Sequence, residues 1–286
     1  MRSIKKIHKA ISAPIGNLIT YRALPTPSID IDGLDPFLFL NHHGPQKYPA
    51  RNSGLPFGPH PHRGFETVTF ILEGDIMHQD TGGHQSTIKA GGIQWMTAGR
   101  GLVHAEVSSE AFKANGGDME ILQLWVNLPA RYKMTEPNYI GLQKEDIPEV
   151  TLDEGKVTLN VISGRWQDVQ APISSLTDIK LSTVYFKAGG KFNAQIPAEH
   201  TIFLYVVRGE ISVNNQSVTK LNLVEFNPDG EDLHLEATTD SVILFGHAQP
   251  YNEPVVAYGP FVMNSEKEIQ EAYQDYQQGK FGVWQD

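Results

Sequence analysis

Two pairs of residues in the first half of the chain have the chemistry of metal ligands. One pair is His60 and His62, and the other is His104 and Glu106. Neutral imidazoles and a carboxylate are suitable ligands for Fe, Mn, Ni, Cu and Zn. A chain with 11 histidines, seven of them at positions 42 to 104, also produces such pairs by chance. Neither pair is therefore specific by itself.

The spacing within each pair is that of neighbours on one face of a β-strand. Side chains at positions i and i+2 of a strand point the same way, so His60 projects with His62, and His104 with Glu106. If both strands line one barrel, the four side chains converge in its interior. Pro61 cannot donate to a strand ladder, so we expect the first strand at a sheet edge or at a bulge. The plainer alternative is that these are surface or core residues near turns.

We expect short strands to carry these residues. Apolar runs alternate with Gly, Pro, Asn and Asp along the whole chain, which is typical of an all-β sandwich or barrel. The run FILEGDI at 70–76 matches YVVRGEI at 205–211, an offset of about half the chain. We therefore predict a duplicated barrel, with domains at 1–135 and 136–286 and a connector over about 130–160.

One helix is predicted near the C-terminus. Ser265 and Glu268 have the spacing of a capping box. Apolar residues follow at helical spacing, and Gly279 supplies a stop. The residues of this apolar face are Ile269, Ala272, Tyr273 and Tyr276. We expect the face to pack on a barrel, within the C-terminal domain.

Composition excludes several classes of protein. The formal net charge of −10 disfavours direct binding to nucleic acid or to an anionic membrane surface. The absence of cysteine excludes disulfides, a thiolate nucleophile and a cysteine zinc site. No run of about 18 apolar residues is present, and the basic N-terminus is not followed by an apolar segment. We expect a cytoplasmic protein without a membrane span or signal peptide.

Three longer motifs give the chain a family resemblance. They are GPHPHRGFETVTFILEG at 58–74, WMTAGRGLVHAE at 95–106 and EPVVAYGPFVMN at 253–264. The first two resemble the two cupin motifs, and all three resemble, more narrowly, the pirin family. The likeness spans nearly the whole chain, and motifs of this length are highly specific.

The resemblance implies a fold and a ligand set. The fold is all-β, with two jelly-roll-like cupin barrels in tandem and one divalent metal ion in the N-terminal barrel. Its ligands carry over to His60, His62, His104 and Glu106. Fe(II) is preferred by resemblance, and Mn, Ni, Cu and Zn remain open. Glu66 occupies the glutamate position of the general cupin motif, but the pirin pattern uses Glu106 instead.

The sequence departs from these patterns at two places. Gly99 stands where the general cupin motif has Pro. In the second half, the 135-residue offset places Gln195 and Pro197 where His60 and His62 stand in the first. Three further candidates lie nearby without the paired spacing: His200, His234 and Glu236. We therefore predict a C-terminal barrel without a metal site.

Other residues near the motifs have two interpretations each. Arg63 and Arg100 are expected to form ion pairs with neighbouring acids, the alternative being a role beside the ligands or in the pocket. Phe57 is a core residue or a pocket wall. His78 and His84 flank a Gly-rich turn and are expected to be solvated.

The resemblance also suggests the function. Some pirins are similar in activity to flavonol 2,3-dioxygenases, so the expected partners are a small hydroxylated aromatic substrate, quercetin-like, and O2. Glu106 would serve as the general base. One alternative is a non-enzymatic metalloprotein that binds a transcription factor or an enzyme in a redox-dependent way. Another is an enzyme acting on a different small hydroxylated metabolite.

Overall fold

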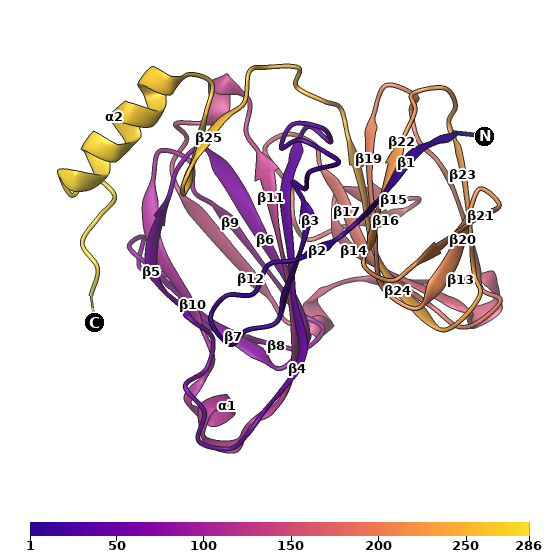
Figure 1. The fold of residues 1–286 in the computed structure, drawn as a ribbon, viewed down its shortest axis with the longest axis horizontal. Coiled ribbons are helices and arrows are strands. Elements are labelled where there is room, and N and C mark those ends of the chain that lie inside the picture. Colours follow the sequence, from indigo (N-terminus) through magenta and orange to yellow (C-terminus); the bar gives the residue numbers. More distant parts are fainter. Residues whose placement is uncertain (286) are drawn as a thin grey trace. The chain divides into compact units, whose positions relative to one another are not determined.

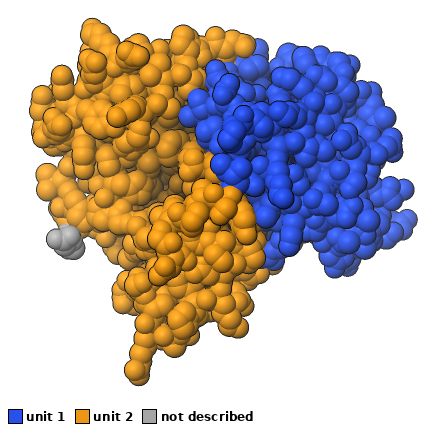
Figure 2. Space-filling model, in the orientation of Figure 1, with its two compact units in different colours: residues 1–11, 23–36, 146–250 blue, residues 12–22, 37–145, 251–286 orange. Residues whose placement is uncertain are grey.

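The structure is a computed structural model that describes residues 1–285, and most of them lie in strands (Figure 1). The chain forms two compact units (Figure 2). Unit 1 consists of residues 1–11, 23–36 and 146–250, and unit 2 of residues 12–22, 37–145 and 251–286. The predicted all-β class with a C-terminal helix is confirmed.

The two units are not the contiguous halves 1–135 and 136–286 of the predicted arrangement. The N-terminal residues 1–11 belong to unit 1, and residues 251–286, with the C-terminal helix, belong to unit 2. Each unit thus receives one end of the chain from the other half of the sequence. Hydrophobic patterning identifies strands but not the sheet that each strand joins, so it does not predict this exchange of ends.

Unit 2 is built on a seven-stranded and a four-stranded antiparallel sheet. The first has the order β12-β9-β6-β11-β4-β3-β2 and the second the order β5-β10-β7-β8. Their strands are β2 (Ile11–Ser12), β3 (Thr20–Leu24), β4 (Phe37–Tyr48), β5 (Phe57–His62), β6 (Phe65–Glu73), β7 (Asp75–Asp80), β8 (Gln85–Lys89), β9 (Ile93–Thr97), β10 (Leu102–Val107), β11 (Gly117–Asn127) and β12 (Asn138–Leu142).

Unit 1 repeats this pairing of sheets. Its strand orders are β1-β22-β19-β24-β17-β14-β13 and β18-β23-β20-β21, with a short β15-β16 ribbon. The strands are β1 (Ile4–Lys9), β13 (Glu149–Leu152), β14 (Val157–Ser163), β15 (Arg165–Trp166), β16 (Val169–Gln170), β17 (Lys180–Phe186), β18 (Lys191–Gln195), β19 (Thr201–Arg208), β20 (Glu210–Val213), β21 (Gln216–Thr219), β22 (Asn222–Phe226), β23 (Asp232–Ala237) and β24 (Ser241–Ala248). In Figure 1 the indigo β1 lies beside the orange β22, with which it pairs.

The expected connector over 130–160 contains regular structure. It carries β12, β13, the first residues of β14 and three 3-10 helices, η1 (Ala130–Tyr132), η2 (Lys144–Asp146) and η3 (Asp153–Gly155). The burial of β12 and β13 is only partial. Such half-buried polar strands at sheet ends have a weak apolar pattern, which is why the sequence predicts a connector there.

Helices are few in the described part of the chain. They are α1 (Glu110–Asn115) and α2 (Glu266–Gln277), and none is long and apolar enough to cross a bilayer. Ser265 is confirmed as the N-cap of α2, because its Oγ accepts from the N–H of Glu268 at 3.3 Å, and the Glu268 carboxylate in turn accepts from Ser265 Oγ and from the N–H of Asn264. Ile269 and Ala272 are buried with Phe261 and other apolar residues of unit 2. The hairpin of β25 (Val256–Tyr258) and β26 (Phe261–Met263) precedes this helix.

Candidate metal centre

Strands β5 and β10 position the predicted ligands. They pair antiparallel, with His60 opposite His104 and His62 opposite Leu102. Strand β5 lies at the edge of its sheet. Its register with β10 shifts between His104 and Glu106, where Glu106 lies opposite Phe57. An edge strand with an irregular register is what Pro61 predicts, since a proline interrupts the hydrogen-bond ladder.

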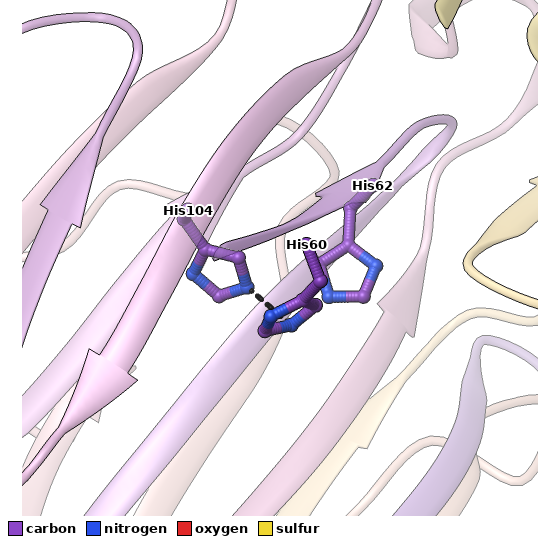
Figure 3. Close-up of side chains that lie close together, drawn as sticks. All are labelled: His60, His62 and His104. Carbon is purple, nitrogen blue, oxygen red and sulfur yellow. Dashed lines mark hydrogen bonds between the residues drawn. The ribbon is translucent and has the colours of Figure 1, made fainter. Parts of the chain in front are cut away.

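The three histidines converge in the interior of unit 2. Each of His60, His62 and His104 offers a ring nitrogen, and these nitrogens all lie within 4.8 Å of one another. The Nε2 atoms of His60 and His104 are 3.0 Å apart (Figure 3). Two nitrogens at right angles around one ion, each about 2.1 Å from it, would also lie about 3 Å apart. The arrangement therefore fits a transition metal ion.

Hydrogen bonds fix two of the three rings in the form that can bind a metal. His60 Nδ1 lies 2.8 Å from the carbonyl oxygen of Gly58, and His62 Nδ1 lies 3.2 Å from that of Pro260. A carbonyl can only accept, so each Nδ1 carries the proton and each Nε2 keeps a free lone pair. The Nε2 atom of His62 is buried and has no partner among residues 1–285. A cation is the partner that such a nitrogen lacks.

Burial keeps the imidazoles of His62 and His104 neutral. It lowers the pKa of His62 to about 3, with a further lowering by the neighbouring His60. Burial also lowers the pKa of His104 well below its ordinary value, and the charges of His62, His60 and His78 act in the same direction. Neutral imidazole is the ligand form of histidine. The site is therefore ready to bind a cation at neutral pH.

Glu106, the fourth predicted ligand, is buried on β10 but is not one of the three converging residues. Thr69 Oγ1 donates to its Oε1 at 2.7 Å, and the Gln123 amide donates to its Oε2. Each carboxylate oxygen has a further lone pair for a cation or a proton. The ligand role of Glu106 stays a prediction. Thr69 and Gln123 were not identified from the sequence, because they lie on other strands, β6 and β11.

Glu66 lies away from this cluster. Alternation along β6 places it on the opposite face from Thr69, which contacts Glu106. Its carboxylate accepts from Thr97 Oγ1 at 2.6 Å, and burial raises its pKa. This placement is consistent with the prediction that Glu106, and not Glu66, is the ligating glutamate.

Gly99, the other departure from the general motif, has a backbone reason. Its φ is +50°, which proline cannot adopt, and a Cβ at this position would lie 2.2 Å from the carbonyl oxygen of Thr135. The chain therefore requires glycine at this turn.

The expectation that His78 is solvated was wrong. His78 is 1% exposed, its Nε2 lies 2.9 Å from Asp80 Oδ2, and its ring stacks on Tyr139 at 3.9 Å. Its ring centroid is 5.5 Å from that of His104. His84 is partly exposed and also bonds to Asp80. The i,i+2 spacing of His78 and Asp80 is the signal that could have identified this pair.

The C-terminal segment supports the ligand strand from outside. His62 bonds to the Pro260 carbonyl of this segment. Arg63, in the turn between β5 and β6, forms an ion pair with Asp275 of α2 at 2.9 Å and lies over the ring of Phe281. The predicted ion pair of Arg63 is thus confirmed, as is that of Arg100, which pairs with Glu136 at 2.8 Å. The contacts with the C-terminal segment join residues about 200 positions apart and have no local sequence signal.

Aromatic residues surround the histidines. Trp125 and Phe65 lie edge-on to the His62 ring at 5.5 and 5.0 Å. Phe57 packs with a small apolar cluster of unit 2 and contacts the ring of His43 at 5.1 Å. His60 is the part-exposed member of the three-histidine cluster. Figure 2 shows that the surface of unit 2 is hollowed, without identifying the residues that line the hollow.

The histidines of unit 1 have different partners from those of the cluster in unit 2. His200 Nδ1 lies 2.9 Å from His247 Nδ1, and His234 Nδ1 lies 2.6 Å from Asn193 Oδ1. Burial lowers the pKa of His247 to about 3, and the charge of His200 lowers it further. His200 thus contacts His247, whereas His234 contacts an asparagine. The three histidines therefore do not reproduce the three-histidine arrangement of unit 2. The absence of a metal site from the C-terminal barrel stays a prediction.

Comparison with known proteins decides the family. The Pirin family model matches residues 18–126, and the model of the Pirin C-terminal cupin domain matches residues 181–282. A pirin-like protein of Solanum lycopersicum is 39% identical over 98% of this chain and 92% of its own length. The chain belongs to the pirin family. Two cupin domains in tandem, as the resemblance implied, are therefore confirmed.

Solved structures agree with this assignment. The crystal structure of quercetin 2,3-dioxygenase from Acinetobacter baumannii has a TM-score of 0.93 and 35% identity to this pirin, covering 99% of both chains. A more distant bacterial pirin from Escherichia coli, solved in complex with nickel(II), has 21% identity and a TM-score of 0.65, and covers 86% of this chain and 99% of its own. The second likeness concerns the fold alone.

Proposed function

We propose that this pirin is a metal-dependent dioxygenase that opens the ring of a quercetin-like flavonol with O2. The observation that carries the proposal is the convergence of three imidazoles whose ring nitrogens lie within 4.8 Å of one another. The likeness to a quercetin 2,3-dioxygenase over the full length of both chains supports the choice of reaction. The proposed ligands are His60, His62, His104 and Glu106, and the proposed ion is Fe(II).

The ion would supply Lewis acidity, which lowers the pKa of a substrate hydroxyl bound to it. The chain's own residues orient the ligands and pack against them. The Gly58 and Pro260 carbonyls hold His60 and His62 in orientation through their Nδ1 protons. The Trp125 ring packs edge-on against the His62 ring. A ligand cluster held in this way keeps its geometry when substrate enters.

Glu106 is the proposed general base. Its carboxylate would accept the proton of the flavonol hydroxyl, because it lies on β10 two residues beyond His104 and retains lone pairs beside its two donors. Thr69 and Gln123 hold the carboxylate in place while the proton transfers. The hydroxyl beside the carbonyl of a flavonol is acidic, which suits a carboxylate base.

The test is an assay of metal-loaded protein with quercetin under air, which follows loss of the flavonol absorbance and uptake of O2. We expect His60→Ala and His104→Ala to lower turnover by at least about 100-fold, since each removes a metal ligand. His234→Ala is the matched control, because the ring of this unit 1 histidine contacts Asn193, while its backbone N–H donates to Asn214 Oδ1. Ligand variants that match the wild-type protein in turnover would contradict the proposed site.

A further inference from the structure

Arg22 is a half-buried cation on the same side of β4 as the aromatic residues near the metal centre. Its Nε donates to Asn41 Oδ1 at 2.5 Å, and its Cζ lies 4.1 Å over the ring of Phe39. A guanidinium has five N–H groups, and only one of them is used in this contact. Within residues 1–285 no carboxylate forms an ion pair with Arg22.

Arg22 is half-buried and has no counter-charge from a carboxylate within the described residues. Burial lowers the pKa of Arg22, and no neighbouring acid offsets the cost of its desolvation. Its partner, Asn41, is neutral. A partly desolvated cation without a paired acid attracts an anion more strongly than a fully hydrated one does. The unused Nη groups are not buried, so they are accessible from outside the protein.

An unbroken series of ring contacts joins Arg22 to the metal centre. Phe39 stacks on Trp125 with centroids 4.4 Å apart, and Trp125 meets the His62 ring at 5.5 Å. Phe39 and Trp125 are partly exposed, whereas their neighbours along the two strands are fully buried. These neighbours are Leu38, Leu40, Leu124 and Val126, each 0% exposed. The two rings are therefore partly accessible to solvent along the contacts that join the cation to the histidines.

We propose that Arg22, Phe39 and Trp125 form a subsite for an anionic aromatic group, so that the substrate is an aromatic molecule bearing a carboxylate or an ionised phenol away from its metal-binding oxygens. The flat rings would stack on Phe39 and Trp125, and the guanidinium would bind the anion through its paired N–H groups. The inference deepens the proposed dioxygenase function by naming a substrate class, and the link to the metal rests on that function.

The experiment compares 2-naphthoate with 2-naphthamide, two probes that differ in charge but hardly in shape. Their dissociation constants are measured by calorimetric titration of the metal-loaded full-length protein. We expect naphthoate to bind at least about tenfold more tightly, the usual contribution of a hydrogen bond to a charged group. Arg22→Gln should abolish this preference while leaving naphthamide binding unchanged, and Arg22→Lys should retain part of it.

Arg100→Gln is the matched control, because it removes an exposed arginine of the same unit that pairs with Glu136. It should leave both dissociation constants unchanged. Equal binding of the two probes to the wild-type protein would overturn the subsite. So would a preference for naphthoate that survives in Arg22→Gln, which would place the carboxylate on the metal instead.

The quercetin assay separates this inference from the proposed function. An Arg22-dependent preference without quercetin consumption would uphold the anion subsite and contradict the flavonol dioxygenase. Quercetin consumption without any preference for naphthoate would support the flavonol dioxygenase and contradict the anion subsite.

Discussion

At the scale of single residues, the environment of Glu106 decides what it can do. Both of its carboxylate oxygens already accept a hydrogen bond, one from Thr69 and one from Gln123. Such a carboxylate cannot rotate freely, so it would present the same lone pairs to every substrate. Glu66 differs from Glu106 in position, because its carboxylate lies on the opposite face of β6 from Thr69 and accepts from Thr97.

Replacing Glu106 by Gln should keep the size of the side chain and remove its basicity. We expect turnover of quercetin to fall by about 100-fold to 10,000-fold, the usual contribution of a positioned general base. Initial rates measured at equal metal occupancy test this expectation. A variant that retains more than about a third of wild-type turnover would show that Glu106 is not the base.

Lys133 is another residue whose partners determine its effect. Lys133 is 1% exposed. Its ammonium donates to the carbonyls of Gly64 and Val262 and to Asn127 Oδ1, at 2.8 to 3.0 Å. Lys133→Met should leave these three acceptors without this donor and lower the free energy of unfolding by about 2–4 kcal/mol. Denaturant unfolding measures the loss.

The control for Lys133 is Lys267→Met on the exposed face of α2, where the lysine forms a surface ion pair with Glu271. Such pairs contribute about 0–1 kcal/mol. If the free energy of unfolding fell equally in both variants, the buried position of Lys133 would have no special importance for stability.

At the scale of elements, the metal centre depends on how β5, β10 and the C-terminal hairpin meet. The turn after His62 contains Gly64, with φ of +89°, and a Cβ there would lie 2.0 Å from the carbonyl oxygen of Val262. The same hairpin region supplies the Pro260 carbonyl that orients His62. Side-chain volume at Gly64 would therefore push the supporting segment away from the ligand.

Gly64→Ala should lower both the free energy of unfolding and the affinity for metal. We expect a stability loss of at least about 2 kcal/mol, from strain at positive φ together with the clash. Gly155→Ala isolates the strain, because Gly155 has φ of +86° and a Cβ added there would meet no atom within 4 Å. Equal losses in the two variants would contradict the packing role assigned to Gly64.

The elements also show what the sequence could predict. Period-two spacing sufficed to pair His60 with His62, because it depends only on local strand geometry. The convergence of His60 and His104 was expected from the family resemblance, because local sequence does not determine which strands pair. The hydrogen bond to Pro260, the support of Arg63 by α2 and the donors to Glu106 depend on distant segments. The motifs carry no signal for any of these contacts.

At the scale of the whole molecule, both units contain buried neutral histidines. Burial lowers the pKa of His43 in unit 2 and of His247 in unit 1 to about 3. Below the ordinary pKa of about 6.5 the unfolded chain takes up protons that the folded chain does not bind. The free energy of unfolding should therefore fall as the pH decreases from about 6.5 towards 3.

Each such histidine contributes a slope of about 1.4 kcal/mol per pH unit. Denaturant unfolding of the metal-free protein at about pH 7, 6 and 5 measures the total slope. His43→Gln should reduce the slope between about pH 6 and 5 by that amount, since glutamine keeps a polar partner for Thr20 but does not titrate. An unchanged slope in this variant would show that His43 is protonated in the folded protein.

The proposed chemistry depends above all on joint binding of one transition metal ion by His60, His62 and His104. The decisive measurement is elemental analysis of the wild-type protein and of His104→Ala, both purified without added metal. We predict one ion per wild-type chain and almost none in the variant. An equal metal content in the two proteins would contradict this prediction.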